Sequence, residues 1–319
     1  MAVKLSVWMI TYNHEKFIAQ AIESVLMQET DFDYELVIGE DCSTDNTRPI
    51  VQDYGRKYPE RIRLLLHEKN LGGRQNGRLT REACQGEYIA ILEGDDYWTD
   101  PHKLQKQVDY MDAHPECAIS CHRARVLRED DPDGTVEFYP DVEPESITTF
   151  TDLVLQGDYI PTASAVYRSN LTKRLSRSFM GLPAGDYALL LLNALHGNIH
   201  YSSEVMSVYR RHAGGVTASW PTKYYMQVRV ATCRYLSTVA GPEHRALLRS
   251  EIGRLSYELV LHCEKIGDAR RARYFAFQRV CAGHFVPELE NPIRQLIRLY
   301  VPGLHRLART CKRALGGGK

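Results

Sequence analysis

The chain has 319 residues, of which 44% are hydrophobic and 25% are charged, which excludes a disordered or fibrous protein. Basic residues number 40 and acidic residues also number 40, so the formal charge is zero, whereas a protein that wraps duplex nucleic acid normally has a basic excess. No apolar run reaches the roughly 20 residues that a membrane-spanning helix needs. We therefore expect no nucleic-acid partner and a cytoplasmic location.

The first half of the chain alternates strand patterns with helix patterns. Short apolar runs predict strands over residues 5–10, 34–39, 62–67 and 88–93. Amphipathic segments predict helices over residues 13–26, where Asn13 would be the N-cap, and over 47–58, 76–84 and 102–114. This alternation indicates a parallel α/β sheet, in which ligands bind beyond the carboxyl ends of the strands.

The next part of the chain adds further strands and one helix. Residues 130–144, which are acidic and contain proline and glycine, are predicted to form an exposed loop. Strand patterns follow over 159–168 and 199–210, on either side of a buried helix around 189–195. We assign these elements and those of the first half to one α/β domain, residues 1–217.

From Pro221 onward only helix patterns remain, which predicts a helical C-terminal region over residues 218–319. Its last helix, within 292–315, sets arginine and lysine beside leucine and isoleucine and contains no acidic residue. This composition is typical of a basic amphipathic helix on a membrane surface, which would make the protein peripheral to the membrane. The alternative is a helix packed against the α/β domain or against a second copy in a homo-oligomer.

Acidic residues gather where the predicted strands end. Glu40 and Asp41 end the second strand, and Glu93, Asp95 and Asp96 follow the fourth. Carboxylates at one edge of a sheet repel one another unless a cation joins them. Oxygen ligands suit Mg²⁺ or Mn²⁺, which typically bind one or two carboxylates together with substrate phosphates. The chain has no glycine-rich dinucleotide turn and no P-loop, so we expect a metal to hold the phosphates of the ligand.

Three segments, in this order, resemble motifs of the family 2 glycosyltransferases of GT-A fold. They are LSVWMITYNHEKFIAQAIESVLMQ, ELVIGEDCSTDNT and NLGGRQNGRLTREACQGEYIAILEGDDYW, and the likeness covers roughly residues 3–215. It implies an α/β, Rossmann-like and mostly parallel sheet flanked by helices, with the helical C-terminal region as an extension. Residues 1–125 would form the nucleotide-binding half of the catalytic domain and residues 126–217 the acceptor-binding half.

The resemblance also implies a nucleotide-diphosphate sugar as donor, most simply a UDP- or dTDP-sugar, with Asp41 accepting a hydrogen bond from the base. The side chains expected to bind this donor are Thr11, Tyr12, Asn13, Glu40, Asp41, Arg74, Asn76, Asp95, Arg210 and Arg211. Those expected to hold Mn²⁺ or Mg²⁺ are Asp95, Asp96 and His212. Glu40 and Glu93 depart from the family pattern, since each replaces an aspartate, but both keep the charge.

Asp186, just ahead of the apolar helix, matches the family's general base. It would take the proton of an acceptor hydroxyl as that oxygen attacks the anomeric carbon, while charge builds up on the departing diphosphate beside the metal. One displacement of this kind inverts the anomeric centre. The acceptor is expected to be a glycan or lipid-linked sugar of a bacterial polysaccharide pathway, contacting Trp98, Thr162 and Ser164.

Several alternatives stay open at this point. Asp186 would instead be a helix N-cap, and Arg210 and Arg211 would instead be ordinary solvated side chains. The chain would instead be a non-catalytic nucleotide-sugar-binding subunit, or a sugar-phosphate nucleotidyltransferase. The last of these carries a glycine-rich basic loop near its N-terminus, which LSVWMITYNHEKF lacks.

Overall fold

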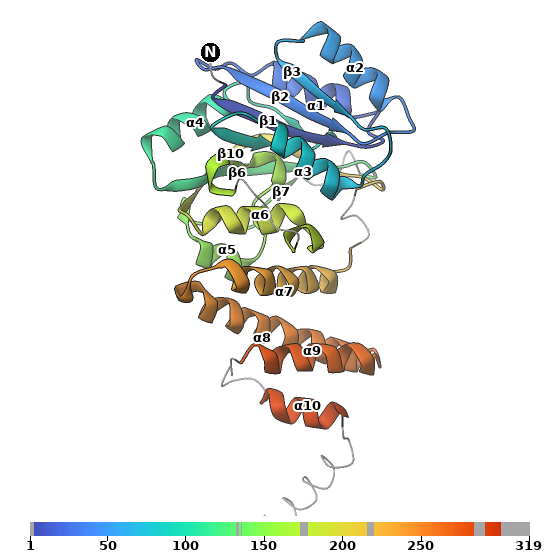
Figure 1. Cartoon of the computed structure of the whole chain (residues 1–319), viewed down its shortest axis with the longest axis vertical. Coiled ribbons are helices and arrows are strands. Elements are labelled where there is room, and N and C mark those ends of the chain that lie inside the picture. Colours follow the sequence, from blue (N-terminus) through green and yellow to red (C-terminus); the bar gives the residue numbers. More distant parts are fainter. Residues whose placement is uncertain are drawn as a thin grey trace, which may run out of the picture. The chain divides into compact units, whose positions relative to one another are not determined.

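The computed structural model describes residues 3–131, 134, 136–172, 178–215, 220–283 and 291–300. The chain divides into two compact units, Met1–Ser219 and Trp220–Lys319. The first contains a sheet with helices around it, and the described part of the second contains helices (Figure 1).

The first unit begins with alternating strands and helices. They are β1 (Leu5–Thr11), α1 (Ile18–Leu26), β2 (Tyr34–Glu40), α2 (Thr47–Lys57), β3 (Ile62–Leu66), α3 (Gly73–Ala83), β4 (Tyr88–Ile91), β5 (Tyr97–Trp98) and α4 (Lys103–Ala113). Its later elements are β6 (Cys117–Arg128), β7 (Glu137–Tyr139), β8 (Ile147–Thr148), α5 (Phe150–Gln156), β9 (Val166–Arg168), α6 (Gly185–Ala194) and β10 (Asn198–Arg211). The first list reproduces the strands and helices predicted for this part of the chain, apart from the short strand β5.

The sheet is parallel in one half and mixed in the other. Strands β3, β2, β1 and β4 lie side by side and run parallel. Strand β1 pairs with β2 from Leu5 opposite Tyr34 to Thr11 opposite Glu40, so the two strands end at the same level. Strand β9 then runs antiparallel to both β4 and β6, while β10 is parallel to β6. The predicted edge of carboxyl ends therefore exists along β1, β2 and β4.

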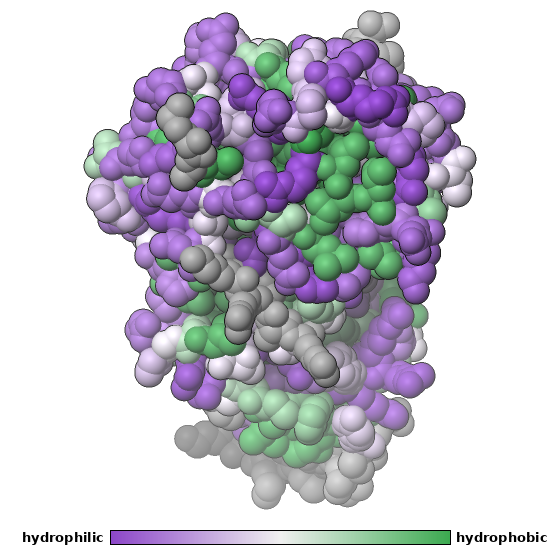
Figure 2. Space-filling model, turned by 45° about the horizontal axis from the view of Figure 1, so that its top comes forward, coloured by the Kyte–Doolittle hydropathy of each residue, from purple (hydrophilic) through white to green (hydrophobic). Residues whose placement is uncertain are grey.

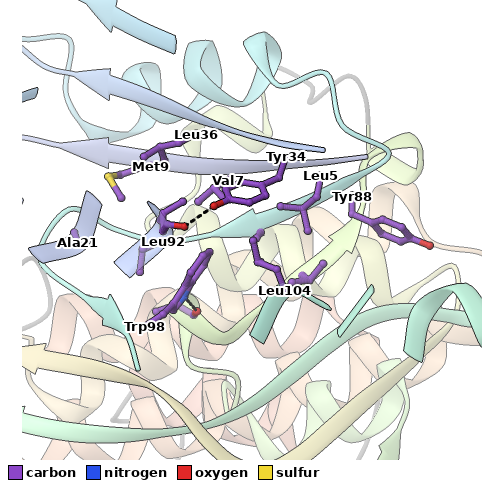
Figure 3. Packing of buried hydrophobic residues seen from close by; sticks show 14 of the residues in the cluster. Leu5, Val7, Met9, Ala21, Tyr34, Leu36, Tyr88, Leu92, Trp98 and Leu104 are labelled. Atoms are coloured by element: carbon purple, nitrogen blue, oxygen red, sulfur yellow. Dashed lines mark hydrogen bonds between the residues drawn. The ribbon is translucent and has the colours of Figure 1, made fainter. Parts of the chain in front are cut away.

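Apolar side chains at alternate positions of the parallel strands, which lie on one face of the sheet, form the main core cluster. Helix α1 turns Ile18, Ile22 and Val25 toward the sheet, at the spacing of one helical face. Two polar atoms in this core have partners, since the Tyr34 hydroxyl donates to the Val25 carbonyl at 2.9 Å and the Trp98 indole donates to a carbonyl at 2.7 Å. Figure 3 shows Tyr34 and Trp98 among the aliphatic residues of this cluster.

Three local predictions are wrong. The strand predicted over 159–168 is limited to β9, because residues 162–164 form a 3₁₀ helix. Asn13 is not the N-cap of the first helix, because α1 begins at Ile18 and Asn13 has a positive φ of 55°. Its side-chain oxygen instead accepts the backbone N–H of Thr44 at 2.8 Å, which ties the turn after β1 to the loop after β2. The segment 130–144 is not all loop, since it contains β7, which pairs with β6.

The second unit is built from the helices α7 (Thr222–Val239), α8 (Pro242–Lys265), α9 (Ala269–Cys281) and α10 (Pro292–Tyr300). The buried carboxylate of Glu251 on α8 joins two of its helices, because it pairs with Arg229 of α7 and with Arg254 of α8. Among the described residues, no helix is both long enough and apolar enough to cross a bilayer. The predicted last helix is described only as far as Tyr300, and the remainder of 292–315 lies outside the described residues.

The face of the molecule in Figure 2 is largely hydrophilic, with hydrophobic residues gathered in separate patches. The cysteines of the described part are free thiols.

Candidate active site

The loops that follow β1, β2 and β4 meet at one edge of the sheet. The backbone N–H of Asp41 donates to the Thr11 carbonyl at 3.1 Å, and that of Gly94 donates to the Ile10 carbonyl at 3.0 Å. A Cβ at position 94 would lie 2.9 Å from the Thr11 Cβ and 3.0 Å from Nδ1 of His14, so glycine allows the close approach of these loops. Acidic side chains from separate segments are thereby brought to one place.

Two histidines face the carboxylate of Asp95. Nε2 of His212 lies 3.1 Å from Oδ2 of Asp95, and Nε2 of His14 lies 3.8 Å from the same oxygen. His212 follows β10, His14 precedes α1 and Asp95 follows β4, so segments far apart in the chain supply the three side chains. Both histidine nitrogens therefore face the same atom, Oδ2 of Asp95.

The charges of these three side chains depend on their surroundings. The hydrogen bond with Asp95 raises the pKa of His212, whereas burial lowers the pKa of His14. Burial by itself would raise the pKa of Asp95, but the hydrogen bond with His212 is the foremost of the interactions that outweigh it and lower that pKa. At neutral pH the site therefore holds an ionised carboxylate and, in His14, a neutral imidazole, which are the forms that bind metals.

The side chains of Asp95, His212 and His14 are of the kinds that bind a divalent metal. A carboxylate with imidazole nitrogens suits Mn²⁺, and the buried Nδ1 of His14 has no hydrogen-bond partner among the described residues. Within the described part of the chain, no group of three or more His, Cys, Asp and Glu side chains is arranged to hold a metal ion by itself. Mg²⁺ and Mn²⁺ commonly take their remaining ligands from substrate phosphates and water. Asp95 and His212, with His14 beside them, could hold a metal in this way.

Asp96, the neighbour of Asp95, is buried against the backbone of β10. It is 1% exposed, and its Oδ1 accepts the backbone N–H of Arg210 at 2.8 Å. Burial, together with the neighbouring Asp95 and Glu93, raises the pKa of Asp96 well above its ordinary value. Asp96 thus fastens β10 to the loop after β4, and its role as a metal ligand stays a prediction.

Arg210 extends from β10 into the site. Its guanidinium donates to the Asp95 carbonyl at 2.5 Å and to the side-chain oxygen of Gln20. It also lies 4.4 Å from the ring centre of Tyr97 and 5.1 Å from that of Phe17. The cation is thus held next to the carboxylate that a diphosphate would approach.

Arg211 lies away from the site, because successive side chains of a strand point to opposite faces. Its guanidinium is 3.8 Å from Glu137 of β7 and 5.6 Å from the ring of Tyr209. The prediction that Arg211 binds the donor is corrected on this ground.

Asp41 lies at the end of β2 and is 2% exposed. Its two carboxylate oxygens accept the backbone N–H groups of Leu71 and Gly72, at 2.7 and 2.9 Å. A carboxylate offers about four lone-pair positions, so acceptor capacity toward a base remains. Asp41 therefore also fixes the loop that precedes α3, in which Gly72 has a φ of 80°.

Two residues predicted to bind the donor are enclosed by protein instead. Glu40 is fully buried, accepts the backbone N–H of Ser43 at 2.7 Å and pairs with Arg48. Asn76 is 1% exposed and donates to the Gly39 carbonyl at 2.9 Å. These predictions are corrected, because both side chains shape the loops around the site and are not open to a ligand.

The other predicted donor contacts lie around the same edge. Thr11 is buried and its hydroxyl has no partner among the described residues, while Tyr12 is exposed. Arg74, at the start of α3, is exposed and donates to the Met180 carbonyl at 3.4 Å. Tyr12 and Arg74 therefore remain accessible to a ligand.

Asp186 lies in the first turn of α6, but the N-cap of that helix is Ala184. Its Oδ1 accepts the backbone N–H of Tyr187 at 2.8 Å, and its Oδ2 accepts the hydroxyl of Thr162 at 3.4 Å. The N-cap alternative is therefore wrong. Two lone pairs of the carboxylate remain for a substrate.

Glu93 connects the two acidic parts of the site. Burial raises its pKa to about 8, and the charges of Asp95 and Asp186 raise it in the same direction. Glu93 is therefore near enough to Asp95 and to Asp186 to be affected by the charge of each.

Trp98 and Ser164 do not reach this site. Trp98 is 1% exposed and donates to the Ala163 carbonyl, and Ser164 is fully buried and donates to the Pro161 carbonyl at 2.7 Å. Their predicted contact with the acceptor is corrected, since both side chains are buried and bonded to backbone carbonyls. Of the three residues named for the acceptor, Thr162 alone touches Asp186.

The sequence did not assign a role to His14 or to Glu93. His14 directly follows the Thr-Tyr-Asn segment at the end of β1, and this position could have marked it as a site residue. Its direction toward Asp95 depends on the turn that leads into α1, which strand and helix patterns do not specify.

Comparisons with known proteins place the chain in a family. Residues 6–213 match the model of glycosyl transferase family 2. An uncharacterized protein of Mycobacterium tuberculosis is 38% identical over 224 residues, which are 69% of this chain and 61% of that protein. The chain thus matches less than two thirds of the length of this relative.

Two solved structures share the fold. Staphylococcus aureus TarS 1-349 in complex with UDP-GlcNAc has a TM-score of 0.56 at 17% identity, covering 89% of this chain and 93% of that one. The Pyrobaculum calidifontis mannosyltransferase in complex with GDP-Man and Mn²⁺ has a TM-score of 0.58 at 17% identity, covering 100% and 89%. These comparisons confirm the predicted family and the predicted α/β GT-A fold.

Proposed function

Since the chain belongs to glycosyl transferase family 2, we propose that it is an inverting, metal-dependent glycosyltransferase. Its donor is a nucleotide-diphosphate sugar and its acceptor is a hydroxyl of a glycan or of a lipid-linked sugar. The observation that carries this proposal is the meeting of His14, Asp95 and His212, from three separate segments, at the edge of the sheet where the parallel strands end.

The donor side of the proposal rests on Asp95, His212 and Arg210. When bound, Mn²⁺ or Mg²⁺ would neutralise the charge that develops on the departing diphosphate. Arg210, held by Gln20 and the Asp95 carbonyl, places a fixed cation beside the same group. The two structural neighbours, in complex with UDP-GlcNAc and with GDP-Man and Mn²⁺, support a donor of this class. Among the bases, uracil or thymine is proposed, recognised by Asp41.

The acceptor side rests on Asp186. Thr162 and the Tyr187 N–H hold its carboxylate in place, so that a remaining lone pair can take the proton of the acceptor hydroxyl. The acceptor oxygen bonds to the anomeric carbon as the bond from that carbon to the diphosphate breaks. Because attack and departure occur on opposite faces, the anomeric centre is inverted. The proposed setting is a bacterial polysaccharide pathway at the cytoplasmic face of the membrane.

An Asp186→Asn variant tests this assignment. By isothermal titration calorimetry, we expect this variant to bind UDP and Mn²⁺ as the native chain does. Its rate of sugar transfer should fall at least 100-fold, since general base catalysis typically contributes 10²–10⁴-fold. Asp152→Asn is the matched control, because Asp152 lies in the first turn of α5 and its carboxylate serves a capping box. Unchanged transfer by Asp186→Asn would remove Asp186 from the mechanism. A native chain that binds nucleotide sugars and transfers none would favour the non-catalytic subunit.

A further inference from the structure

The zero net charge of the chain hides two units of opposite charge. Residues 1–219 contain 22 basic and 33 acidic residues, a net charge of −11, and residues 220–319 contain 18 basic and 7 acidic residues, a net charge of +11. Charge asymmetry of this size between parts of a chain points to a partner of opposite charge. For the second unit that partner is anionic.

Helices α9 and α10 of this unit lie side by side and each keeps an apolar strip exposed. Arg273 of α9 donates to the Leu299 carbonyl at 3.1 Å, and Arg279 of α9 donates to Gln295 at 2.9 Å, which fixes the inner faces. The exposed apolar side chains, called here the α9–α10 face, are Tyr274, Phe277, Ile293, Ile297 and Tyr300. The two helices are adjacent in the second unit (Figure 1).

The α9–α10 face has the periodicity of membrane-surface helices. Ile293, Ile297 and Tyr300 recur at i, i+4 and i+7, and are 50%, 44% and 54% exposed. Tyr274 and Phe277, three residues apart on α9, are each 51% exposed. Aromatic and aliphatic side chains on one face of a basic helix are the groups that enter the boundary between lipid headgroups and acyl chains.

Arginines accompany these apolar side chains. Arg270 and Arg271 open α9, and with Tyr274 and Asp268 they line a hollow of about 570 Å³. Arg294 of α10 is exposed next to Ile293. Guanidinium groups beside an aromatic ring suit a phosphate headgroup, because they donate forked hydrogen bonds to it.

We propose that the α9–α10 face docks on a lipid bilayer that contains anionic lipids. The charge of +11 complements such a surface, and each basic group near it contributes about fivefold to partitioning. A nucleic acid would match the charge but would leave the isoleucines without an apolar partner. A symmetric pair that joined the α9–α10 faces of two copies would set the same positive charge against itself. Arg306, Arg309, Lys312 and Arg313 add charge of the same sign in the sequence that follows Tyr300.

Vesicle flotation of the full chain tests the proposal. Vesicles of phosphatidylcholine alone are compared with vesicles containing 30% phosphatidylglycerol, on the order of the anionic content that polybasic segments recognise. We expect binding only to the anionic vesicles, weakened at high salt. Ile293→Ser/Ile297→Ser should lower the partition coefficient at least tenfold, whereas Val239→Ser, an equally exposed apolar residue at the end of α7, should not. A thermal melt and UDP binding check that each variant is folded, which keeps this test separate from that of the transfer activity.

Three outcomes would overturn the proposal. The first is equal flotation of the double serine variant and the native chain. The second is absence of flotation with anionic vesicles. The third is that light scattering finds the native chain to be an oligomer and the double serine variant a monomer, while the two float equally. The α9–α10 face would then hold a second copy of the chain.

Discussion

Lys103 gives a quantitative prediction, because a lysine is completely buried in the core of the first unit. Its side chain has no exposed surface, its Nζ donates to Oε1 of Gln107 at 2.7 Å, and it lies 4.2 Å from the ring centre of Trp98. Burial lowers the pKa of Lys103 to about 7. The folded chain therefore gives up a proton that the unfolded chain, with a lysine pKa of about 10.4, still holds.

The free energy of unfolding should consequently rise with pH between pH 7 and pH 9. In this range the unfolded state binds one proton more than the folded state once Lys103 is neutral, and stability rises where the unfolded state binds more protons. Lys103 is half protonated at pH 7 and neutral above pH 8. At 1.36 kcal/mol per pH unit for a full proton, the rise amounts to about 2 kcal/mol over the two units.

Lys103→Met removes the titrating group while keeping most of its volume. Between pH 7 and pH 9, we expect the free energy of unfolding to rise by about 2 kcal/mol more for the native chain than for this variant. The measurement is urea unfolding followed by circular dichroism. Lys106→Met is the matched control on α4, because Lys106 is 43% exposed and its pairs with Asp100 and Glu204 raise its pKa, so it stays protonated throughout. If the free energy of unfolding rose equally with pH in the native chain and in Lys103→Met, this result would refute the argument.

Further predictions concern the site and its frame. Arg210→Gln should weaken binding of UDP with Mn²⁺ at least tenfold by calorimetry, while Arg211→Gln should leave it within twofold, because only the first points at the site. His14→Ala should lower Mn²⁺ affinity about tenfold in electron paramagnetic resonance titrations; unchanged affinity would place His14 outside the metal shell. Gly39→Ala should destabilise the chain by about 1–3 kcal/mol in urea unfolding, because its Cβ would lie 1.9 Å from the Thr80 hydroxyl.

The sequence alone predicted the strands and helices of the parallel half of the sheet. It also predicted the edge of the sheet on which the site lies. Strands such as β1 and β2 are short apolar runs, and their parallel pairing brings Thr11 and Glu40 to the same level. The position of Asp95 followed from the same reasoning, since it comes directly after β4. These features depend on local composition and on the general geometry of α/β sheets.

The sequence could not tell which acidic or polar side chains of a motif face the ligand. Asp95 and Asp96 are adjacent and chemically identical, yet one meets His212 and the other is buried against the backbone of Arg210. Likewise, Lys103 looks like any helix lysine in the sequence, and its burial against Trp98 depends on packing.

What the sequence determined by itself is therefore the family, the alternation of strands and helices and the strand ends at which acids collect, because each is written in short-range patterns. The tertiary structure decided the direction of each side chain and the meeting of His14, Asp95 and His212 from segments nearly two hundred residues apart. It also decided the burial that shifts the pKa of Glu93. Such properties arise from desolvation and from long-range contacts, which exist only once the chain has folded.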